Sequence, residues 1–132
     1  MSMNRGDKRA YRSPTGVLSA APLSDAVLVG DLIFLSGQIG LDESGKLVHG
    51  GAAAETRMCL QKIKQLLESY GASLSDIAQI RAYLTDFSQY AAYNEAYREF
   101  IAAPFPTRAT IGASELAFGA TIETEAIAAM HE

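Results

Sequence analysis

Residues near the end of this chain have the types and spacing needed to bind and hydrolyse a small carboxylated molecule. Arg108 lies near the start of a run of β-type residues, 107–111, and a second such run, 120–129, carries Glu123 and Glu125. The two glutamates are two residues apart, so both point to the same face of a strand. A guanidinium can bind a carboxylate through two hydrogen bonds, and a nearby carboxylate can orient a water molecule for attack.

The same residues also fit a purely structural interpretation. A lone arginine at a strand end often makes only a weak surface ion pair, and two acids on one strand face are often solvated. Periodicity alone does not decide which of Glu123 and Glu125 would face a pocket. Arg108 and Thr110 share a strand face, which adds a hydroxyl group beside the guanidinium.

Other polar residues have two interpretations as well. Ser36 and Gly37 end an apolar run, where they offer a hydroxyl and backbone groups to a pocket or simply terminate a strand with a turn glycine. Asn94 lies among tyrosines in a helical stretch, where an asparagine is mildly unfavourable and most often faces solvent. Cys59 lies in another helical stretch with no histidine placed to activate it, so we expect a structural thiol.

The composition favours one globular domain over residues 1–132. Hydrophobic residues make up 48% of the 132 residues and charged residues 20%, which suits a single modest core. Residues 1–20 are largely polar and contain Pro14 and Gly16, so we expect an irregular lead-in there.

The charge and the cysteine content exclude several classes of function. The net charge is -4 and no run of lysine and arginine occurs, which argues against a nucleic-acid partner. One cysteine and two histidines lie far apart, and the glycines form no phosphate-binding loop, so we expect neither a metal nor another cofactor. No apolar run has transmembrane length and the N-terminus lacks an apolar signal segment, so we expect a cytoplasmic protein without a membrane partner.

Hydrophobic patterns predict strands followed by helix, strand, helix, strand and strand. Two apolar runs flank Gly30-Asp31 and predict a β-hairpin over 26–36. The other expected elements are a helix over 52–70 ended by Gly71, a strand over 78–84, a helix N-capped by Ser88 and ended by Pro104 and Pro106, and strands over 107–111 and 120–129.

This element order predicts an α+β layered fold with a mixed β-sheet. Two long helices cannot cover both faces of the sheet, so we expect both of them to pack on one face. The other face would still carry apolar residues such as Ile127. Such a face tends to be buried in an oligomer.

Four stretches of the chain occur in an order that resembles the Rid family, also called YjgF/YER057c/UK114. They are Val-Gly-Asp-Leu-Ile-Phe-Leu-Ser-Gly-Gln at 29–38, Tyr-Asn-Glu-Ala-Tyr at 93–97, Phe-Pro-Thr-Arg at 105–108 and Ile-Glu-Thr-Glu-Ala-Ile-Ala at 122–128. Each stretch alone is a weak signal, whereas all four with helices between them are specific. The resemblance covers the chain from about Pro22 to Ala129.

The resemblance implies a chorismate-mutase-like subunit that assembles as a homotrimer, with pockets in the clefts between subunits. It implies that Arg108 grips a substrate carboxylate and that Glu123 handles a water molecule. Ser36 and Gly37 match the wall of the family pocket. Asn94 matches a helix asparagine that often lies near that pocket.

Two positions depart from the family pattern. Family deaminases often have a tyrosine after the lead-in proline, where this chain has Leu23, and a cysteine two residues after the arginine, where it has Thr110. Loss of an aromatic wall at Leu23 should change the shape of the pocket. The cysteine's role is expected to depend on its backbone, which Thr110 retains.

The resemblance therefore implies a hydrolase acting on carbon–nitrogen bonds, an enamine/imine deaminase. It would convert 2-aminoacrylate or 2-imino acids into 2-keto acids and ammonia. One alternative is a non-catalytic module that binds small carboxylates or stabilises proteins through the same intersubunit cleft. Another is a ribonuclease or translation inhibitor, against which the acidic charge balance counts.

Overall fold

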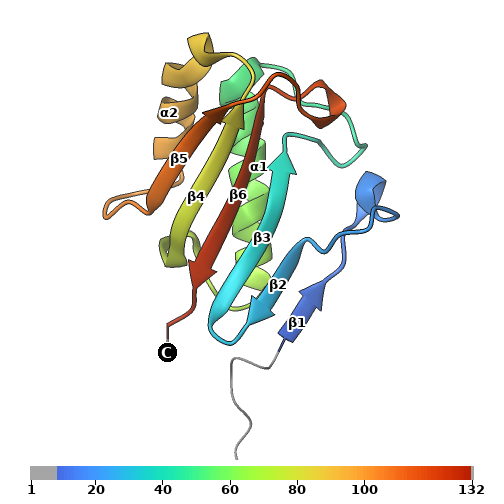
Figure 1. Cartoon of the computed structure of the whole chain (residues 1–132), viewed down its shortest axis with the longest axis vertical. Helices are drawn as coiled ribbons and strands as arrows, with labels where there is room; N and C mark the ends of the chain where they lie inside the picture. The colour runs from blue at the N-terminus through green and yellow to red at the C-terminus, as the bar shows by residue number, and fades with distance from the viewer. Residues whose placement is uncertain (1–8, 132) are drawn as a thin grey trace, which may run out of the picture.

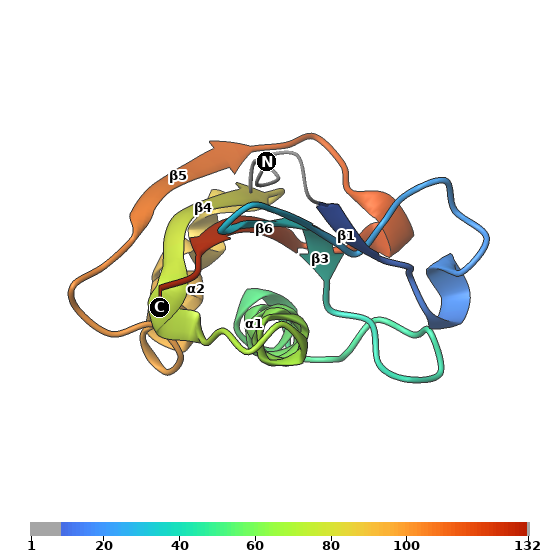
Figure 2. The same cartoon turned by 90° about the horizontal axis from the view of Figure 1, so that it is seen from below.

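The computed structural model describes residues 9–131, which form a six-stranded sheet with two helices on one side (Figure 1 and Figure 2). In chain order the elements are β1 (Arg9–Arg12), β2 (Ala26–Val29), β3 (Leu32–Ile39), α1 (Gly51–Ser69), β4 (Ile77–Leu84), α2 (Tyr90–Arg98), β5 (Thr107–Gly112) and β6 (Ile122–Ala129). The strand order is β1-β2-β3-β6-β4-β5, and only β4 and β5 run parallel. This confirms the α+β fold with a mixed sheet.

The hairpin of β2 and β3 forms around Gly30-Asp31 as predicted. Val29 pairs with Leu32, so two residues connect the strands. Gly30 has a φ of 61°, a left-handed conformation that glycine adopts without steric cost. In β3, Ile33 points into the core and is fully buried.

Helix α1 buries an apolar stripe against the sheet. Its bounds differ by one residue at each end from the predicted 52–70. Neither α1 nor any other helix within residues 9–131 combines the length and the apolar character needed to cross a bilayer. The fully buried residues of the stripe contact the strands above them and include Cys59, Leu60, Ile63 and Leu67.

Helix α2 differs from the prediction in its length and its cap. It has only nine residues, so it is not the second long helix that we expected, and a 3₁₀ turn over Phe87–Gln89 precedes it. The predicted cap at Ser88 is wrong, because the Asp86 carboxylate accepts hydrogen bonds from both the backbone N–H and the hydroxyl of Ser88. Asp86 thus caps the 3₁₀ turn that contains Ser88, whereas α2 itself begins after Gln89, whose side chain makes no capping hydrogen bond.

The expectation of an irregular lead-in over 1–20 is wrong for Arg9–Arg12, which pair with β2 as the edge strand β1. All four residues are exposed, so no alternation of apolar residues marks this strand in the sequence. The strand depends instead on the open edge of β2. Residues 1–8 of the lead-in lie outside the described part of the chain.

The sheet has one face covered by the helices, the helix face, and an opposite face that we call the open face. Figure 2 shows the sheet arching over α1 and α2. Strand β6 alternates between the faces, as its pattern predicted. Its buried residues on the helix face are Ile122, Thr124, Ala126 and Ala128, and its partly exposed residues on the open face are Glu123, Glu125 and Ile127.

Candidate active site

Arg108 lies on the helix face of the edge strand β5, where tyrosines of α2 hold its side chain. Its strand partner is Ile80 of β4, which is fully buried beneath the helices. The guanidinium carbon lies 5.0 Å from the ring centroids of both Tyr93 and Tyr97, and Nη2 donates to the Tyr90 hydroxyl at 2.9 Å. Each cation–π contact contributes about 0.5–2 kcal/mol, so these rings fix the guanidinium in place.

Five buried hydroxyl groups within residues 9–131 have no hydrogen-bond partner, those of Thr56, Tyr93, Tyr97, Thr110 and Thr124. Tyr93 and Tyr97 contact the Arg108 guanidinium, and Thr110 shares its strand face. Burial raises the pKa of Tyr93 to about 12 and also raises that of Tyr97, so both hydroxyls keep their protons at neutral pH. Potential donors beside a fixed cation suit a bound anion such as a carboxylate.

No carboxylate within residues 9–131 forms an ion pair with Arg108. The ion pairs in that part of the chain join Arg57 to Glu99 and His131 to Asp76. The Arg108 side chain is half-buried against aromatic rings, and its planar fork is therefore available to a carboxylate from another molecule.

Glu123 lies on the open face of β6, beside a bulge in β3. Ser36 and Gly37 of β3 both lie opposite the single residue Glu125, because the register of the two strands shifts by one residue there. A Cβ atom at Gly37 would collide with the Glu123 carboxylate. The Glu123 carboxylate therefore occupies space that is free only because residue 37 is a glycine.

Hydrogen bonds anchor both strands that form this arrangement. The Ser36 hydroxyl donates to the Ser24 carbonyl at 2.5 Å, which ties the bulge to the segment before β2. Glu55 of α1 is almost fully buried, and its Oε1 accepts from the backbone N–H of Thr121 at 2.7 Å, just before β6 begins. The position of Glu123 is thus set from α1 as well as from its own strand.

The environment of Glu123 favours its protonated form. Burial raises the pKa of Glu123 above its ordinary value, and the negative charge of Glu125 raises it further. Tyr83, the partner of Glu123 on β4, donates its hydroxyl to Glu125, and this hydrogen bond raises the pKa of Tyr83. A carboxylate with a raised pKa is a better proton acceptor, which suits a general base acting on water.

We expect the Glu125→Gln substitution to lower the pKa of Glu123, because it removes the nearby negative charge. The pKa should stay above the ordinary value for glutamate, since burial is the larger cause of the increase. Carbon-13 NMR titration of the side-chain carboxyl groups measures both values. Glu43→Gln, at an exposed turn, is the control and should leave the pKa of Glu123 unchanged. An unchanged or higher pKa in Glu125→Gln contradicts the coupling.

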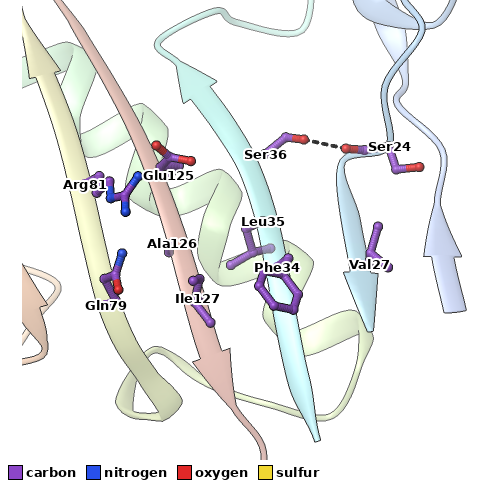
Figure 3. Close-up of a pocket in the computed structure, with 10 residues that line it drawn as sticks. All are labelled: Ser24, Val27, Phe34, Leu35, Ser36, Gln79, Arg81, Glu125, Ala126 and Ile127. Carbon is purple, nitrogen blue, oxygen red and sulfur yellow. Dashed lines mark hydrogen bonds between the residues drawn. The ribbon is translucent and has the colours of Figure 1, made fainter. Parts of the chain in front are cut away.

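A shallow cavity of about 310 Å³ lies on the open face (Figure 3). Figure 3 shows Arg81 of β4 extending toward Glu125 of β6, with Ile127 farther along β6 and Phe34 on the adjacent strand β3. Ser36 is the expected site residue that lines this cavity, and Glu123 is not in its lining. The lining residues are Ser24, Val27, Phe34, Leu35, Ser36, Gln79, Arg81, Glu125, Ala126 and Ile127.

The expected site residues divide into two groups on opposite faces of the sheet. Arg108 and Thr110 lie on the helix face, whereas Glu123 and Gly37 lie on the open face. Through β4, Arg108 is level with Ala126, three residues along β6 from Glu123. Strand spacing and rise then separate the two backbones by on the order of 14 Å. One chain therefore does not bring the carboxylate receptor and the water-handling acid together.

Two further expected residues lie near these groups. Asn94 is half-buried on α2, one turn after Tyr90, and thus on the same side of the helix as the hydroxyl that binds Arg108. Leu23 is 40% exposed and directly precedes Ser24, a lining residue of the open-face cavity. Leu23 thus lies near the group that contains Ser36, and Asn94 lies on the same side of the sheet as Arg108.

Sequence reasoning missed the tyrosines as partners of Arg108. Their helical spacing predicted core or interface anchors, and Tyr93 is indeed fully buried. Their contact with Arg108 could have been predicted from the connection between the parallel strands β4 and β5. This connection runs through α2 and places the helix over the strand that carries Arg108. The acid-bonding role of Tyr83 was also missed, because a cross-strand contact depends on register.

Within residues 9–131, no group of three or more histidine, cysteine, aspartate or glutamate side chains is arranged to hold a metal ion. Cys59 is fully buried, and burial raises its pKa to about 12, so its thiol stays protonated. This agrees with the structural role expected for it.

Comparison with known proteins identifies relatives of this chain. Residues 15–130 match the family described as endoribonuclease L-PSP. A 2-iminobutanoate/2-iminopropanoate deaminase from Dermatophagoides farinae is 34% identical over 121 residues, which cover 91% of this chain and 94% of that protein.

Solved structures show the same fold. RidA from the Antarctic bacterium Psychrobacter sp. PAMC 21119 superimposes with a TM-score of 0.82 and 32% identity, covering 90% of this chain and 94% of that chain. A member of the YjgF/YER057c/UK114 family from Mycobacterium tuberculosis gives a TM-score of 0.81 and 29% identity, covering 93% of this chain and 100% of that chain. The similarity thus extends over nearly all of this chain and of each relative.

Proposed function

This chain belongs to the endoribonuclease L-PSP family, the Rid (YjgF/YER057c/UK114) family, and from that membership we propose that it hydrolyses 2-imino acids and 2-aminoacrylate to 2-keto acids and ammonia. The relative from Dermatophagoides farinae is named for 2-iminobutanoate and 2-iminopropanoate, both small carboxylates with an imine carbon next to the carboxylate. We expect the same class of substrate here.

The observation that carries this proposal is the state of Arg108. Its guanidinium is half-buried against Tyr93 and Tyr97, bonded to the Tyr90 hydroxyl, and without a carboxylate partner within residues 9–131. A cation held in this way can donate hydrogen bonds to the two oxygens of a substrate carboxylate and so fix the adjacent imine carbon.

The proposed reaction needs one water molecule and no further reactant. Glu123 accepts a proton from the water while the oxygen bonds to the imine carbon, and the electron pair of the C=N bond moves to nitrogen. Glu123 returns this proton to nitrogen, which gives a carbinolamine with one hydroxyl and one amino group on the same carbon. The hydroxyl proton then passes through Glu123 to the amino group, the C–N bond breaks, and a C=O bond forms as ammonia leaves. Glu123 can return the proton that it accepted, because its raised pKa suits both directions of transfer.

The site in this proposal forms between two copies of the chain in a homotrimer. Arg108 of one subunit would meet Glu123 and Gly37 of its neighbour, because the two groups lie on opposite faces within one chain. The open face supports such an assembly: Leu32 and Phe34 are each 41% exposed on neighbouring positions of β3. Closure by three-fold rotation would bury this face on all subunits.

An imine-trapping assay tests the proposed function. An amino-acid oxidase generates 2-imino acids in the presence of semicarbazide, and the trapped semicarbazone is measured with and without the protein. We expect the protein to lower semicarbazone formation by hydrolysing the imine first. Unchanged trapping across small, branched and aromatic side chains would exclude these substrates.

Mixing two inactive variants tests the position of the site between subunits. We expect Arg108→Ala and Glu123→Gln chains, co-expressed with different tags and purified as mixed trimers, to recover activity. A functional site then needs Arg108 from a Glu123→Gln chain and Glu123 from an Arg108→Ala chain, which occurs in roughly a third of the sites of purified mixed trimers. Homotrimers of each variant are the controls. Mixed trimers as inactive as both controls contradict the intersubunit site.

One observation favours a second candidate, a non-catalytic module that binds small carboxylates. The exposed Leu23 stands where family deaminases often have an aromatic wall. Such a module would bind 2-oxobutanoate through Arg108 in a calorimetric titration and yet leave the trapping assay unchanged. We do not propose the ribonuclease activity that the family description names, because the net charge of -4 opposes contact with phosphates.

A further inference from the structure

The bulge in β3 forms the wall against which the Glu123 carboxylate lies. Gly37, inside the bulge, leaves no room for a Cβ atom beside that carboxylate. A displacement of the bulge backbone by a fraction of an ångström would therefore move the carboxylate or open a gap beside it. Proton transfer to and from water depends on such distances, so whatever fixes the bulge also affects catalysis.

Two side chains of α1 reach the backbone directly after the bulge. The Cys59 thiol donates to the carbonyl of Gln38, with Sγ and the oxygen 3.1 Å apart, and Lys62 Nζ donates to the carbonyl of Ile39 at 3.0 Å. Cys59 and Lys62 are three residues apart in the helix, so both project from the same side of it. The helix therefore holds two consecutive carbonyl groups of β3.

The polar groups that make these two contacts, the Cys59 thiol and the Lys62 ammonium group, are removed from water, which is unfavourable unless they form hydrogen bonds. Cys59 is fully buried, and the raised pKa of its thiol keeps the S–H donor intact. Burial lowers the pKa of Lys62, which means that the fold keeps this ammonium group in a partly desolvated place. Lysine rarely occupies such a position unless its donors are used, and Ile39 supplies an acceptor.

The opposite end of the bulge is tied to the segment before β2. The backbone N–H of Ser36 donates to the Asp25 carbonyl at 2.9 Å, and the Ser36 hydroxyl donates to Ser24. The bulge is thus held at its start by residues 24–25 and at its end by α1.

We propose that Cys59 and Lys62 are positioning residues for the deamination: they hold the β3 bulge so that Gly37 sets the place of the Glu123 carboxylate. Neither side chain would touch the substrate. Their effect would pass through the Gln38 and Ile39 carbonyls to the backbone of Gly37. This inference rests on the proposed role of Glu123.

The test uses matched pairs of variants in the full-length protein. Lys62→Met keeps most of the apolar stem and removes the donor, whereas Lys62→Arg keeps a donor. Cys59→Ala removes the thiol, whereas Cys59→Ser keeps a donor of similar size. Lys64→Met is the control for loss of a positive charge on α1, since Lys64 is two residues away on another side of the helix.

We expect Lys62→Met and Cys59→Ala to lower kcat by about ten- to a hundredfold with little change in KM, because Arg108 lies on the other face. Lys62→Arg and Cys59→Ser should recover much of the loss, and Lys64→Met should match the wild type. A role in stability alone would lower the melting temperature while kcat of the folded trimer stayed unchanged, and that result overturns the inference.

A second readout does not depend on turnover. Carbon-13 NMR titration follows the pKa of Glu123, which is surrounded by Glu125 on its own strand, Tyr83 on β4 and Cys59 on α1. We expect this pKa to shift in Lys62→Met and to be unchanged in Lys64→Met. If the wild type fails to hydrolyse imines, the proposed function fails, while the titration still decides whether α1 positions this carboxylate. Identical titrations in both variants contradict the positioning role.

Discussion

Replacing Arg108 with alanine is expected to abolish imine hydrolysis and to leave the fold intact. The variant loses the proposed bidentate contact with the substrate carboxylate, and with it the orientation of the imine carbon. Together these effects should lower kcat/KM by about a thousandfold or more. The fold should persist, because Arg108 lies on an edge strand and contributes no ion pair within residues 9–131.

Two further variants separate the binding role of Arg108 from its packing. Arg108→Lys keeps the charge but loses the planar fork, so we expect partial activity with a raised KM. Arg12→Ala removes another arginine that packs on a tyrosine, since its guanidinium lies 5.1 Å from the Tyr70 ring centroid. This control should retain wild-type turnover. Near-wild-type turnover by Arg108→Ala, in a protein with normal circular dichroism, would remove the carboxylate-receptor role.

The Glu123→Gln substitution is expected to lower kcat by about 10²–10⁴-fold, the usual contribution of a general base. Glutamine has nearly the same shape but cannot accept a proton from water. The affinity for an unreactive carboxylate such as 2-oxobutanoate should change little, because Arg108 and not Glu123 would bind it. Steady-state kinetics and calorimetry measure the two quantities separately.

Glu125→Gln is the matched control for this experiment. Glu125 lies on the same face of β6, two residues away, and is hydrogen-bonded by Tyr83. We expect Glu125→Gln to keep most of the turnover, although it should lower the pKa of Glu123. A Glu123→Gln variant with normal kcat and weakened substrate affinity would show that Glu123 binds the substrate and does not handle the water.

Local patterns predicted most elements, and their failures have a common cause. Helix α1 was predicted within one residue at each end and the hairpin at Gly30-Asp31 within three, because turn chemistry and helical periodicity are properties of adjacent residues. Strand β1 was missed because its four residues are all exposed and it forms only by pairing with β2. The Ser88 cap was wrong because Ser88 lies inside a 3₁₀ turn that Asp86 caps, and α2 begins only after Gln89.

For the candidate site, the family resemblance predicted roles for Arg108 and Glu123, and the structure added the surroundings of both residues. The spacing of Tyr93 and Tyr97 predicted that they lie on one side of a helix, but not that Arg108 would lie beneath them. The bulge that places Gly37 beside Glu123 was also invisible, because it is a shift between two strands that are distant in the chain. The contacts of Cys59 and Lys62 depend on that bulge.

The amino-acid sequence by itself determined most of the elements, which residues of β6 share a face, and which family the chain resembles. These properties follow from periodicity and from the order of short motifs along the chain. Only the tertiary structure decided that Arg108 and Glu123 lie on opposite faces of the sheet. That outcome depends on the register of β4 with both β5 and β6, and a shift of one residue in either pairing would move a side chain to the other face.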